Sequence, residues 1–291
     1  MIKIEAFLVN AFTSNGSGGN PAGVVLHSDN LSNEEKLKIA QEVGYSETAF
    51  VSKDTEVDFE LSFFTITGEV DFCGHATLAA FSTMYKEGIV VEGQYIQRTK
   101  AGLLAVTIAL NGKIVMQQKQ PKCLGQLDCT TVSSLIGIDT RLLESTLLPI
   151  EVVSTGLPDI IVPVPLGYLN QIQVNDELLS LFCKKHALVG LHAFELCEEE
   201  SKLTASCRNF APLFGIQEES ATGSSSGALA CYLSKHIFLN PLNDFIFEQG
   251  RAMNRLSIIT ASVESNESGI IRVTVGGFAQ RIGRQHIYLK Q

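Results

Sequence analysis

Apolar and polar residues alternate along much of this chain with the short period that is typical of β-strands. Strand patterns rich in Val, Ile, Leu or Phe occur at Met1–Val9, Phe59–Phe64, Leu103–Leu110, Lys113–Gln118 and Ile271–Val275. The first of these alternates as a half-buried or edge strand does. We therefore expect sheet to dominate the fold.

Asn111-Gly112 lies between two of these predicted strands. A two-residue type I′ turn needs a positive φ at both central positions, and Asn followed by Gly meets that need best. The sequence therefore predicts a tight β-hairpin here, with a two-residue turn.

Three segments have helical patterns. Residues 32–42 begin with a capping box, in which Ser32 is followed three positions later by Glu35. The other two segments, about 74–85 and 223–236, are apolar nearly all round. A helix of that kind is expected to be buried rather than to lie on the surface.

The two apolar helices form part of an internal repeat. A shift of 149 positions (223 − 74 = 149) aligns Gly74 with Gly223 and Lys86 with Lys235. Each helix also follows a strand, an acidic loop and a turn of Gly, Ser or Thr residues. We therefore predict an α+β fold of two pseudo-symmetric halves, each a curved mixed sheet around a central helix.

Composition narrows the class of protein. The 291 residues are 45% hydrophobic and 18% charged, as in a packed fold and unlike a disordered chain. The net charge of -9 argues against nucleic-acid binding and against attachment to an anionic membrane. No stretch approaches the ~20 apolar residues of a membrane span, and the N-terminus lacks the pattern of a signal peptide. We expect a soluble, cytoplasmic protein.

The seven cysteines are scattered along the chain, without a Cys-x-x-Cys pair or a tight His/Cys cluster in the sequence. This spacing gives no zinc motif, so no metal is predicted. It is typical of reduced and mostly buried thiols.

Both apolar helices begin with residues that suit an anion. Cys73–His75 opens the first helix and Thr222–Ser224 opens the second. The N-terminus of a helix offers free backbone N–H groups and a partial positive charge, which attract a carboxylate. Ordinary N-caps would explain either start alone, but the repeated pair favours a ligand site in which both helix starts point into one cleft and hold a substrate carboxylate.

Glu47 is the first candidate for acid–base chemistry, because it lies between Ser46 and Thr48 directly before an apolar strand. An exposed carboxylate at a strand start is the simpler explanation. The alternative is a carboxylate that faces a cleft, where loss of water raises its pKa and makes it a useful proton shuttle. These residues alone leave both explanations open.

A set of motifs occurs in a fixed order over almost the whole chain. The set consists of Asn10–Thr13, Gly19–Ala22, Ser46–Phe50, Gly68–Thr77, Ser154–Asp159, Arg208–Pro212, Ala221–Ser224 and Phe247–Gly250. In these segments the chain resembles the PhzF-like phenazine biosynthesis family, within the diaminopimelate epimerase superfold. Each motif is weak by itself, whereas the ordered set is specific.

The resemblance implies a diaminopimelate epimerase-like fold of two lobes with the active site between them. The expected lobes are residues 1–120, to which residues 278–291 return, and residues 121–277. The resemblance also implies a homodimeric isomerase that uses neither a metal nor an organic cofactor. The member that names the family isomerises a dihydro-hydroxyanthranilate by moving a proton, so we expect a small carboxylate as substrate.

The same resemblance implies roles for individual residues. Glu47 would be the general acid/base, assisted by His75, Glu219 and Ser224. The expected substrate-binding residues are Asn20, Ser46, Gly74, Thr222 and Gly223, with Asp71 and Cys73 as possible auxiliaries. The family's usual Asp-Pro is Glu219-Ser220 here, which leaves the identity of the substrate open.

Two alternatives stay open at this point. The first is an epimerase that relies on Cys73, as in relatives of the superfold in which one thiol precedes each central helix. The counterpart of Cys73 in the repeat is Thr222 (73 + 149 = 222), so the second thiol of such a pair is lacking. The second alternative is a non-catalytic, protein-binding member of the family.

Overall fold

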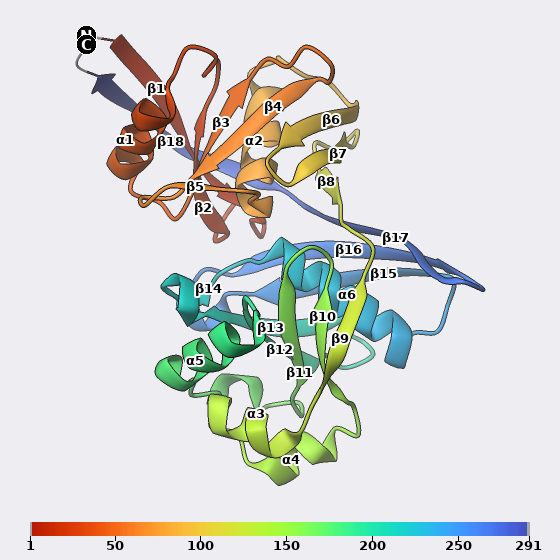
Figure 1. The fold of residues 1–291 in the computed structure, drawn as a ribbon. Coiled ribbons are helices and arrows are strands. Elements are labelled where there is room, and N and C mark those ends of the chain that lie inside the picture. The colour runs from red at the N-terminus through yellow and green to blue at the C-terminus, as the bar shows by residue number, and fades with distance from the viewer. Residues whose placement is uncertain (1, 290–291) are drawn as a thin grey trace. The chain divides into compact units, whose positions relative to one another are not determined.

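The computed structural model describes residues 2–289, and it has a mixed α+β fold with many strands and six α-helices among the described residues (Figure 1). The chain divides into two compact units. Unit 1 comprises the described parts of Met1–Gln117 and Gly276–Gln291, and unit 2 is Gln118–Val275. The predicted α+β class is confirmed, and each unit is described below by itself.

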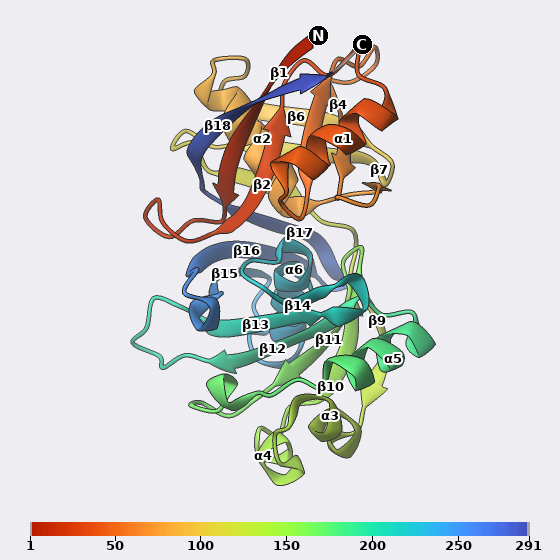
Figure 2. The same ribbon diagram turned by 90° about the vertical axis from the view of Figure 1, so that its left-hand side faces the viewer.

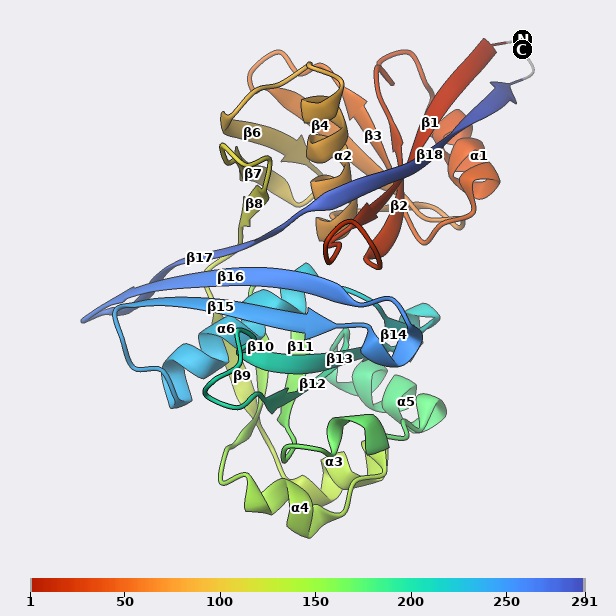
Figure 3. The ribbon, with the colours of Figure 1, turned by 180° about the vertical axis from the view of Figure 1, so that it is seen from behind.

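The sheet of unit 1 begins with a pairing between segments far apart in the chain. Its strands are β1 (Ile2–Ala11), β2 (Asn20–Val25), β3 (Thr48–Ser52), β4 (Phe59–Phe64), β5 (Glu69–Val70), β6 (Gly93–Thr99), β7 (Gly102–Ile108), β8 (Ile114–Gln117) and β18 (Ala279–Leu289). Strand β18 runs antiparallel to the whole of β1, which places Ile2 opposite Leu289 (Figure 3). The order then continues to β2 (antiparallel), β3 (parallel) and β4 (antiparallel). Strand β4 also pairs with β5 (antiparallel) and β6 (parallel), and β6, β7 and β8 form an antiparallel meander.

Two helices pack against this sheet. Helix α1 (Asn33–Val43) connects the parallel strands β2 and β3, and the predicted capping box of Ser32 and Glu35 is present at its start. Its apolar side packs on core residues of β1, β3 and β4. Helix α2 (Gly74–Lys86) lies on the other side of these strands, against β1, β2 and β3 (Figure 2). Every residue from His75 to Met84 is buried, as the all-round apolar pattern predicted.

Unit 2 contains the second set of strands, together with the other four α-helices of the described chain. The strands are β9 (Lys122–Leu127), β10 (Ile150–Ser154), β11 (Pro158–Pro163), β12 (Gly190–Leu196), β13 (Ala205–Ala211), β14 (Ile216–Glu219), β15 (Leu242–Gln249), β16 (Ser257–Asn266) and β17 (Gly269–Gly277), the last of which ends in unit 1. The helices are α3 (Cys129–Ile136), α4 (Thr140–Ser145), α5 (Asp176–His186) and α6 (Gly223–His236), and short 3-10 turns are η1 (Leu169–Gln171), η2 (Pro212–Phe214) and η3 (Arg251–Met253).

The strands of unit 2 pair in the same order as those of unit 1. Strand β10 pairs with β9 and β11 (both antiparallel), β11 with β12 (parallel) and β12 with β13 (antiparallel). Strand β13 then pairs with β14 (antiparallel) and β15 (parallel), as β4 pairs with β5 and β6. Helix α6 follows β14 as α2 follows β5. The repeat seen in the sequence is therefore a repeat of topology.

Successive side chains along the strands of unit 2 point to opposite faces of its sheet. Ile160 and Val162 of β11 belong to the core that includes α3, α4 and α5. Asp159, one position earlier, is bonded by Ser225 of α6, so it points to the opposite face. Residues Ser225 to Leu233 of α6 are all buried. The predicted burial of both central helices is therefore confirmed.

The hairpin at Asn111-Gly112 differs from the prediction. The N–H of Gly112 donates to the carbonyl of Ala109 at 2.8 Å, and the N–H of Ala109 donates to the carbonyl of Lys113 at 2.9 Å. Gly112 has φ 77°, whereas Asn111 is not among the described residues with positive φ. The connection is thus a turn followed by one left-handed glycine, and the predicted two-residue type I′ turn was wrong because only one position is left-handed.

Candidate active site

Glu47 lies in unit 1 between the end of α1 and the start of β3. Its carbonyl accepts a hydrogen bond from the N–H of Gly23 at 3.0 Å, which fixes its backbone against β2. The next residues, Thr48 and Ala49, are fully buried in β3. The Glu47 side chain is only 15% exposed, so the simpler explanation of a surface carboxylate was wrong.

His75 is the partner of this carboxylate. It is the second residue of α2, its side chain is 6% exposed, and its Nε2 atom lies 3.2 Å from Oε2 of Glu47. This Oε2 atom is buried and makes no aligned hydrogen bond with any of residues 2–289, so the contact is an ion pair more than a directional hydrogen bond. The structure thus brings the two first-named catalytic candidates together.

Asn20 and Cys73 surround the other side of the imidazole. Nδ1 of His75 lies 3.3 Å from the Asn20 side-chain amide and 3.4 Å from Sγ of Cys73. The same sulfur lies 3.8 Å from Nε2. Cys73 is the N-cap residue of α2, and Asn20 is the first residue of β2, so regular elements hold both groups.

The surroundings of Glu47 and His75 favour an ionised carboxylate beside a protonated imidazole. Burial alone would raise the pKa of Glu47, but the imidazole beside it, helped by Ser46, holds that pKa below its usual value. Burial would lower the pKa of His75, but the Cys73 sulfur and the Glu47 carboxylate together raise it well above 6.5. Burial also raises the pKa of the Cys73 thiol, so near neutral pH that sulfur is uncharged. Of these two neighbours, the Glu47 carboxylate is therefore the one that carries a negative charge near neutral pH and favours the protonated form of His75.

The other candidates of unit 1 lie at the edge of this cluster. Ser46 is exposed beside Glu47, and Gly74 is the first residue of α2. No side chain of the described residues makes a capping hydrogen bond at this helix start, whose partial positive charge attracts an anion. Asp71 is exposed, and its carbonyl accepts a hydrogen bond from the N–H of Ala101 at 3.2 Å.

The start of α6 gathers the candidates of unit 2. The hydroxyl of Thr222 donates to Oε2 of Glu219 at 2.6 Å, and the Gln249 amide donates to that hydroxyl at 3.1 Å and to the Glu219 carbonyl at 2.7 Å. Thr222 is the N-cap residue, yet among the described groups its side chain makes no capping bond. Ser224 is half-buried, and its carbonyl accepts from the Thr155 hydroxyl at 3.1 Å. Gly223 opens the helix beside them.

Sequence reasoning missed a buried polar network beneath this helix start. Ser225 donates to Oδ2 of Asp159 at 2.6 Å and accepts from the Asn209 amide at 3.1 Å. That amide also lies 3.2 Å from Nδ1 of His192. The other ring nitrogen of His192 is buried and forms no hydrogen bond with the described part of the chain. All four side chains are nearly inaccessible to solvent.

Burial sets the protonation of this network. It raises the pKa of Asp159 to about 6, a shift that the Ser225 hydrogen bond opposes and the Glu219 charge increases. It lowers the pKa of His192 to about 3, so this imidazole is neutral. A charged residue at the head of the apolar strand Ile160–Val164 was the one available signal for the network.

Glu47, Cys73 and His75 are also potential metal ligands. One ligand atom from each lies within 4.8 Å of the others. Cys73 and His75 are two positions apart in the sequence, but Glu47 is distant, and this is why no zinc motif was visible in the spacing. All seven cysteines are free thiols.

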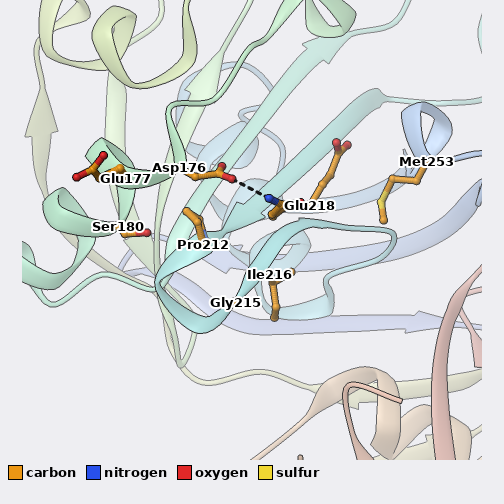
Figure 4. A pocket seen from close by; sticks show the side chains of 9 residues that line it. Asp176, Glu177, Ser180, Pro212, Gly215, Ile216, Glu218 and Met253 are labelled. Carbon is orange, nitrogen blue, oxygen red and sulfur yellow. Dashed lines mark hydrogen bonds between the residues drawn. The ribbon is translucent and has the colours of Figure 1, made fainter. Parts of the chain in front are cut away.

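A broad depression of about 830 Å³ lies elsewhere on unit 2 (Figure 4). The first residues of α5 and the segment 212–218 line it, and Asp176, Glu177 and Glu218 contribute three carboxylates. Asp176 accepts a hydrogen bond from the Gln217 amide at 3.2 Å. None of the predicted site residues is among the described residues that line this depression. Its large size is therefore no evidence that it is the active site.

Comparison with known proteins decides the family. The family model described as phenazine biosynthesis-like protein matches residues 9–282. The chain belongs to this phenazine biosynthesis-like family. An uncharacterized isomerase of Clostridium acetobutylicum is 32% identical over 99% of both chains. The trans-2,3-dihydro-3-hydroxyanthranilate isomerase of Pseudomonas chlororaphis is 28% identical and is matched over 98% of its length and 97% of this chain.

A solved structure agrees with these relatives. The PhzF-family protein of Bacillus anthracis superposes with a TM-score of 0.89 at 28% identity, over 99% of this chain and 100% of that one. The predicted family is confirmed, and so is the prediction of an isomerase, since the relatives bear that name. No helix among the described residues is long and apolar enough to cross a membrane.

Proposed function

We propose that this protein moves a proton between two positions of a small carboxylate-bearing substrate, with Glu47 as the general acid/base. The observation that carries the proposal is the shielded pair of Glu47 and His75, whose Oε2 and Nε2 atoms are 3.2 Å apart. A carboxylate that is nearly inaccessible, ionised and fixed by its neighbours is suited to take up a proton and to return it. The reaction needs no redox partner, because the substrate loses one proton and regains one with no net oxidation or reduction.

His75 would act on Glu47 in two ways. In its protonated form it keeps the carboxylate ionised, so that Glu47 is ready to accept a proton. Its ring also fixes the direction of the carboxylate, since Asn20 and Cys73 hold the opposite nitrogen. After Glu47 takes up the proton, the imidazolium remains as a positive charge that stabilises the negative charge developing on the substrate.

The substrate carboxylate would bind at a helix start. Helix α2 begins at Gly74 directly beside His75, and the partial positive charge of its N-terminus attracts an anion. Helix α6 offers the same kind of start at Gly223 in unit 2. The assisting roles of Glu219 and Ser224, and substrate binding by Thr222, Gly223 and Ser46, stay predictions.

The Pseudomonas chlororaphis relative is named for trans-2,3-dihydro-3-hydroxyanthranilate, which is a cyclic amino acid with a carboxylate. We propose a substrate of this chemical class for the present protein. Glu219 has one methylene more than the aspartate usual at this place in the family, so we expect a different member of the class. A homodimer and a cytoplasmic location also stay predictions.

The test follows exchange of substrate hydrogen in D₂O. The protein is incubated with a panel of small cyclic and amino-acid carboxylates, and NMR detects deuterium at carbon. We expect at least one compound to exchange, and Glu47→Gln to slow that exchange by about 10²–10⁴-fold, the usual contribution of a general acid/base. Glu34→Gln, an exposed position on α1, is the matched control and should exchange at the wild-type rate.

Two outcomes would contradict this proposal. Near wild-type exchange in Glu47→Gln would remove Glu47 from the reaction. Loss of exchange in Cys73→Ser with activity retained in Glu47→Gln would instead favour the Cys73 epimerase. The raised pKa of the buried Cys73 thiol argues against that alternative, because the thiolate is the form that abstracts protons. A panel without any exchange, and without ligand-induced stabilisation, would favour the protein-binding alternative.

A further inference from the structure

The three side chains around Glu47 form a set that suits a metal ion as well as a proton. Glu47 supplies a carboxylate oxygen, Cys73 a sulfur and His75 an imidazole nitrogen, and these atoms lie within 4.8 Å of one another. A mixed set of sulfur, nitrogen and oxygen ligands selects zinc over magnesium or calcium, which prefer oxygen alone. We propose that Glu47, Cys73 and His75 bind Zn²⁺, and that zinc bound there inhibits the enzyme.

The distances approach those of tetrahedral coordination through Nε2 of His75, and the Cys73 side chain would rotate toward that atom, because its Sγ now lies nearer Nδ1 (3.4 Å). Zinc bonds of ~2.0 Å to nitrogen and oxygen and ~2.3 Å to sulfur place tetrahedral ligands ~3.3 Å (N to O) and ~3.5 Å (N to S) apart. The observed separations from Nε2 are 3.2 Å to Oε2 of Glu47 and 3.8 Å to Sγ of Cys73. The remaining pair, oxygen and sulfur, lies within 4.8 Å and has at most ~1.3 Å to close.

The surroundings of the three ligands favour the ion. Zn²⁺ with one thiolate, one carboxylate and one neutral imidazole has no net charge, which reduces the cost of burial. Cys73 and His75 are fixed at the start of α2 and Glu47 at the start of β3, so the set is pre-organised. A ligating histidine donates its other N–H to an oxygen; the Asn20 amide nitrogen lies 3.3 Å from Nδ1, and a half-turn rotation of that amide would bring its oxygen there.

Inhibition follows from which atoms the zinc would occupy, and this part rests on the proposed function. Zinc would displace two protons to solvent, the thiol proton of Cys73 and the Nε2 proton of His75, and would bind the oxygen of Glu47 that faces His75. Zinc on that oxygen withdraws electron density from the whole carboxylate, so Glu47 becomes a much weaker base toward the substrate. The three protein ligands would leave a fourth position for water, as in open zinc sites.

Cobalt(II) provides the readout, because a thiolate bound to it gives a strong near-ultraviolet charge-transfer band. Metal-free full-length protein is titrated with Co²⁺, and Zn²⁺ is then added in competition. We expect one equivalent of Co²⁺ to produce the thiolate band and Zn²⁺ to abolish it. Cys73→Ser should lose the band, and both Cys73→Ser and His75→Asn should weaken zinc binding at least about tenfold, as loss of a supporting group already does.

Cys123→Ser is the matched control, because Cys123 is an exposed thiol that would account for adventitious metal binding. It should leave the band and the zinc affinity unchanged. A band that survives in Cys73→Ser, or equal zinc affinity in wild type and Cys73→Ser, would overturn the site. Circular dichroism of each metal-free variant checks folding, and Glu47→Gln, which keeps the shape of the side chain, gives a second measurement if Cys73→Ser fails to fold.

The same titration separates this inference from the proposed function, since it needs no substrate. If the wild-type protein binds the metal but Glu47→Gln keeps the wild-type exchange rate, only the proposed function is refuted. Loss of activity in Glu47→Gln without a cobalt–thiolate band would refute only the zinc site. Where exchange is measurable, zinc should abolish it and a chelator should restore it.

Discussion

The starts of α2 and α6 occupy the same place in two sheets of the same pairing order, yet they hold different chemistry. At α2 a carboxylate and an imidazole form an ion pair, and β3 is preceded by Glu47. At α6 hydroxyl and amide groups form neutral hydrogen bonds around Glu219 and Asp159, and β12 is preceded by Val189. The repeated topology thus supplies two similar helix starts, and the side chains beside each give it a different chemistry.

The largest expected effect is the difference in proton-exchange rate between a mutation beside the start of α2 and one at the start of α6. Glu47→Gln should reduce proton exchange by about 10²–10⁴-fold, since it removes the proton acceptor. Ser224→Ala removes one neutral hydroxyl at α6 and should cost at most about tenfold, the equivalent of ~1.4 kcal/mol. Both rates are measured by NMR exchange in D₂O on the same substrate. A greater loss in Ser224→Ala would place the main chemistry at α6.

The second effect concerns the buried carboxyl beneath α6. The pKa of Asp159 rises from 3.8 to about 6 on folding, so the folded protein holds this proton more tightly than the unfolded chain. The contribution of Asp159 to stability is complete below pH ~3.9, the usual pKa of an aspartate, and is lost as the pH rises through about 6. With ~1.4 kcal/mol per pKa unit, the loss is on the order of 3 kcal/mol.

Urea unfolding of wild type and Asp159→Asn between pH 4 and pH 7 would measure this effect. The difference in the free energy of unfolding between the two proteins should change by about 3 kcal/mol over that range, with the wild type losing stability as the pH rises. A difference that is independent of pH would show that Asp159 keeps an ordinary pKa in the folded protein.

A smaller effect tests the hydroxyl that holds this carboxyl. Ser225→Ala removes the hydrogen bond to Asp159 and leaves buried groups unsatisfied, which should lower the free energy of unfolding by about 1–3 kcal/mol. Ser226→Ala is the control, because Ser226 only bonds the Thr222 carbonyl within the same helix at 2.8 Å. Thermal or urea unfolding compares them, and an equal loss in both variants would argue against the network.

The smallest effect contrasts a structural helix start with the two functional ones. Helix α1 has a full capping box, whereas α2 and α6 have no side-chain cap from the described residues. Ser32→Ala should therefore cost about 1 kcal/mol of stability without an effect on exchange. Ser268→Ala, at an exposed loop position, should change neither quantity. A loss of exchange in Ser32→Ala would contradict this division of roles.

The sequence predicted the elements whose patterns are local. Phe59–Phe64 is a strand with the expected ends, and Gly223–His236 is a helix with the expected ends. Helices α3, α4 and α5 were not predicted. Helices α3 and α4 are short, with eight and six residues, whereas α5 has 11 residues and one apolar side, a periodic pattern that was overlooked. The turn at Asn111-Gly112 was predicted wrongly in type because the flanking strands, and not the two residues alone, determine the length of the loop.

The site was predictable only in part, for a related reason. The residues beside α2 were found through motifs, but the contact of Glu47 with His75 joins positions 28 residues apart (75 − 47 = 28) and depends on the fold. The network of Asp159, Asn209 and His192 draws on three strands and a helix, and each member has an ordinary local sequence. The closeness of Glu47 to Cys73 and His75 also depends on the fold, so the sequence alone did not predict these three residues as a set of metal ligands.

The pairing of β18 with β1 has a consequence for how the chain is made. Unit 2 is one continuous segment, Gln118–Val275, and all of it is synthesised before residues 279–289. Strand β1 must therefore wait through almost the whole of translation for its outer neighbour, with one row of backbone groups unpaired. Contacts of such long sequence separation form slowly, and an open strand edge invites association with other nascent chains. Unit 1, which holds Glu47 and His75, thus becomes complete only after unit 2 has been synthesised.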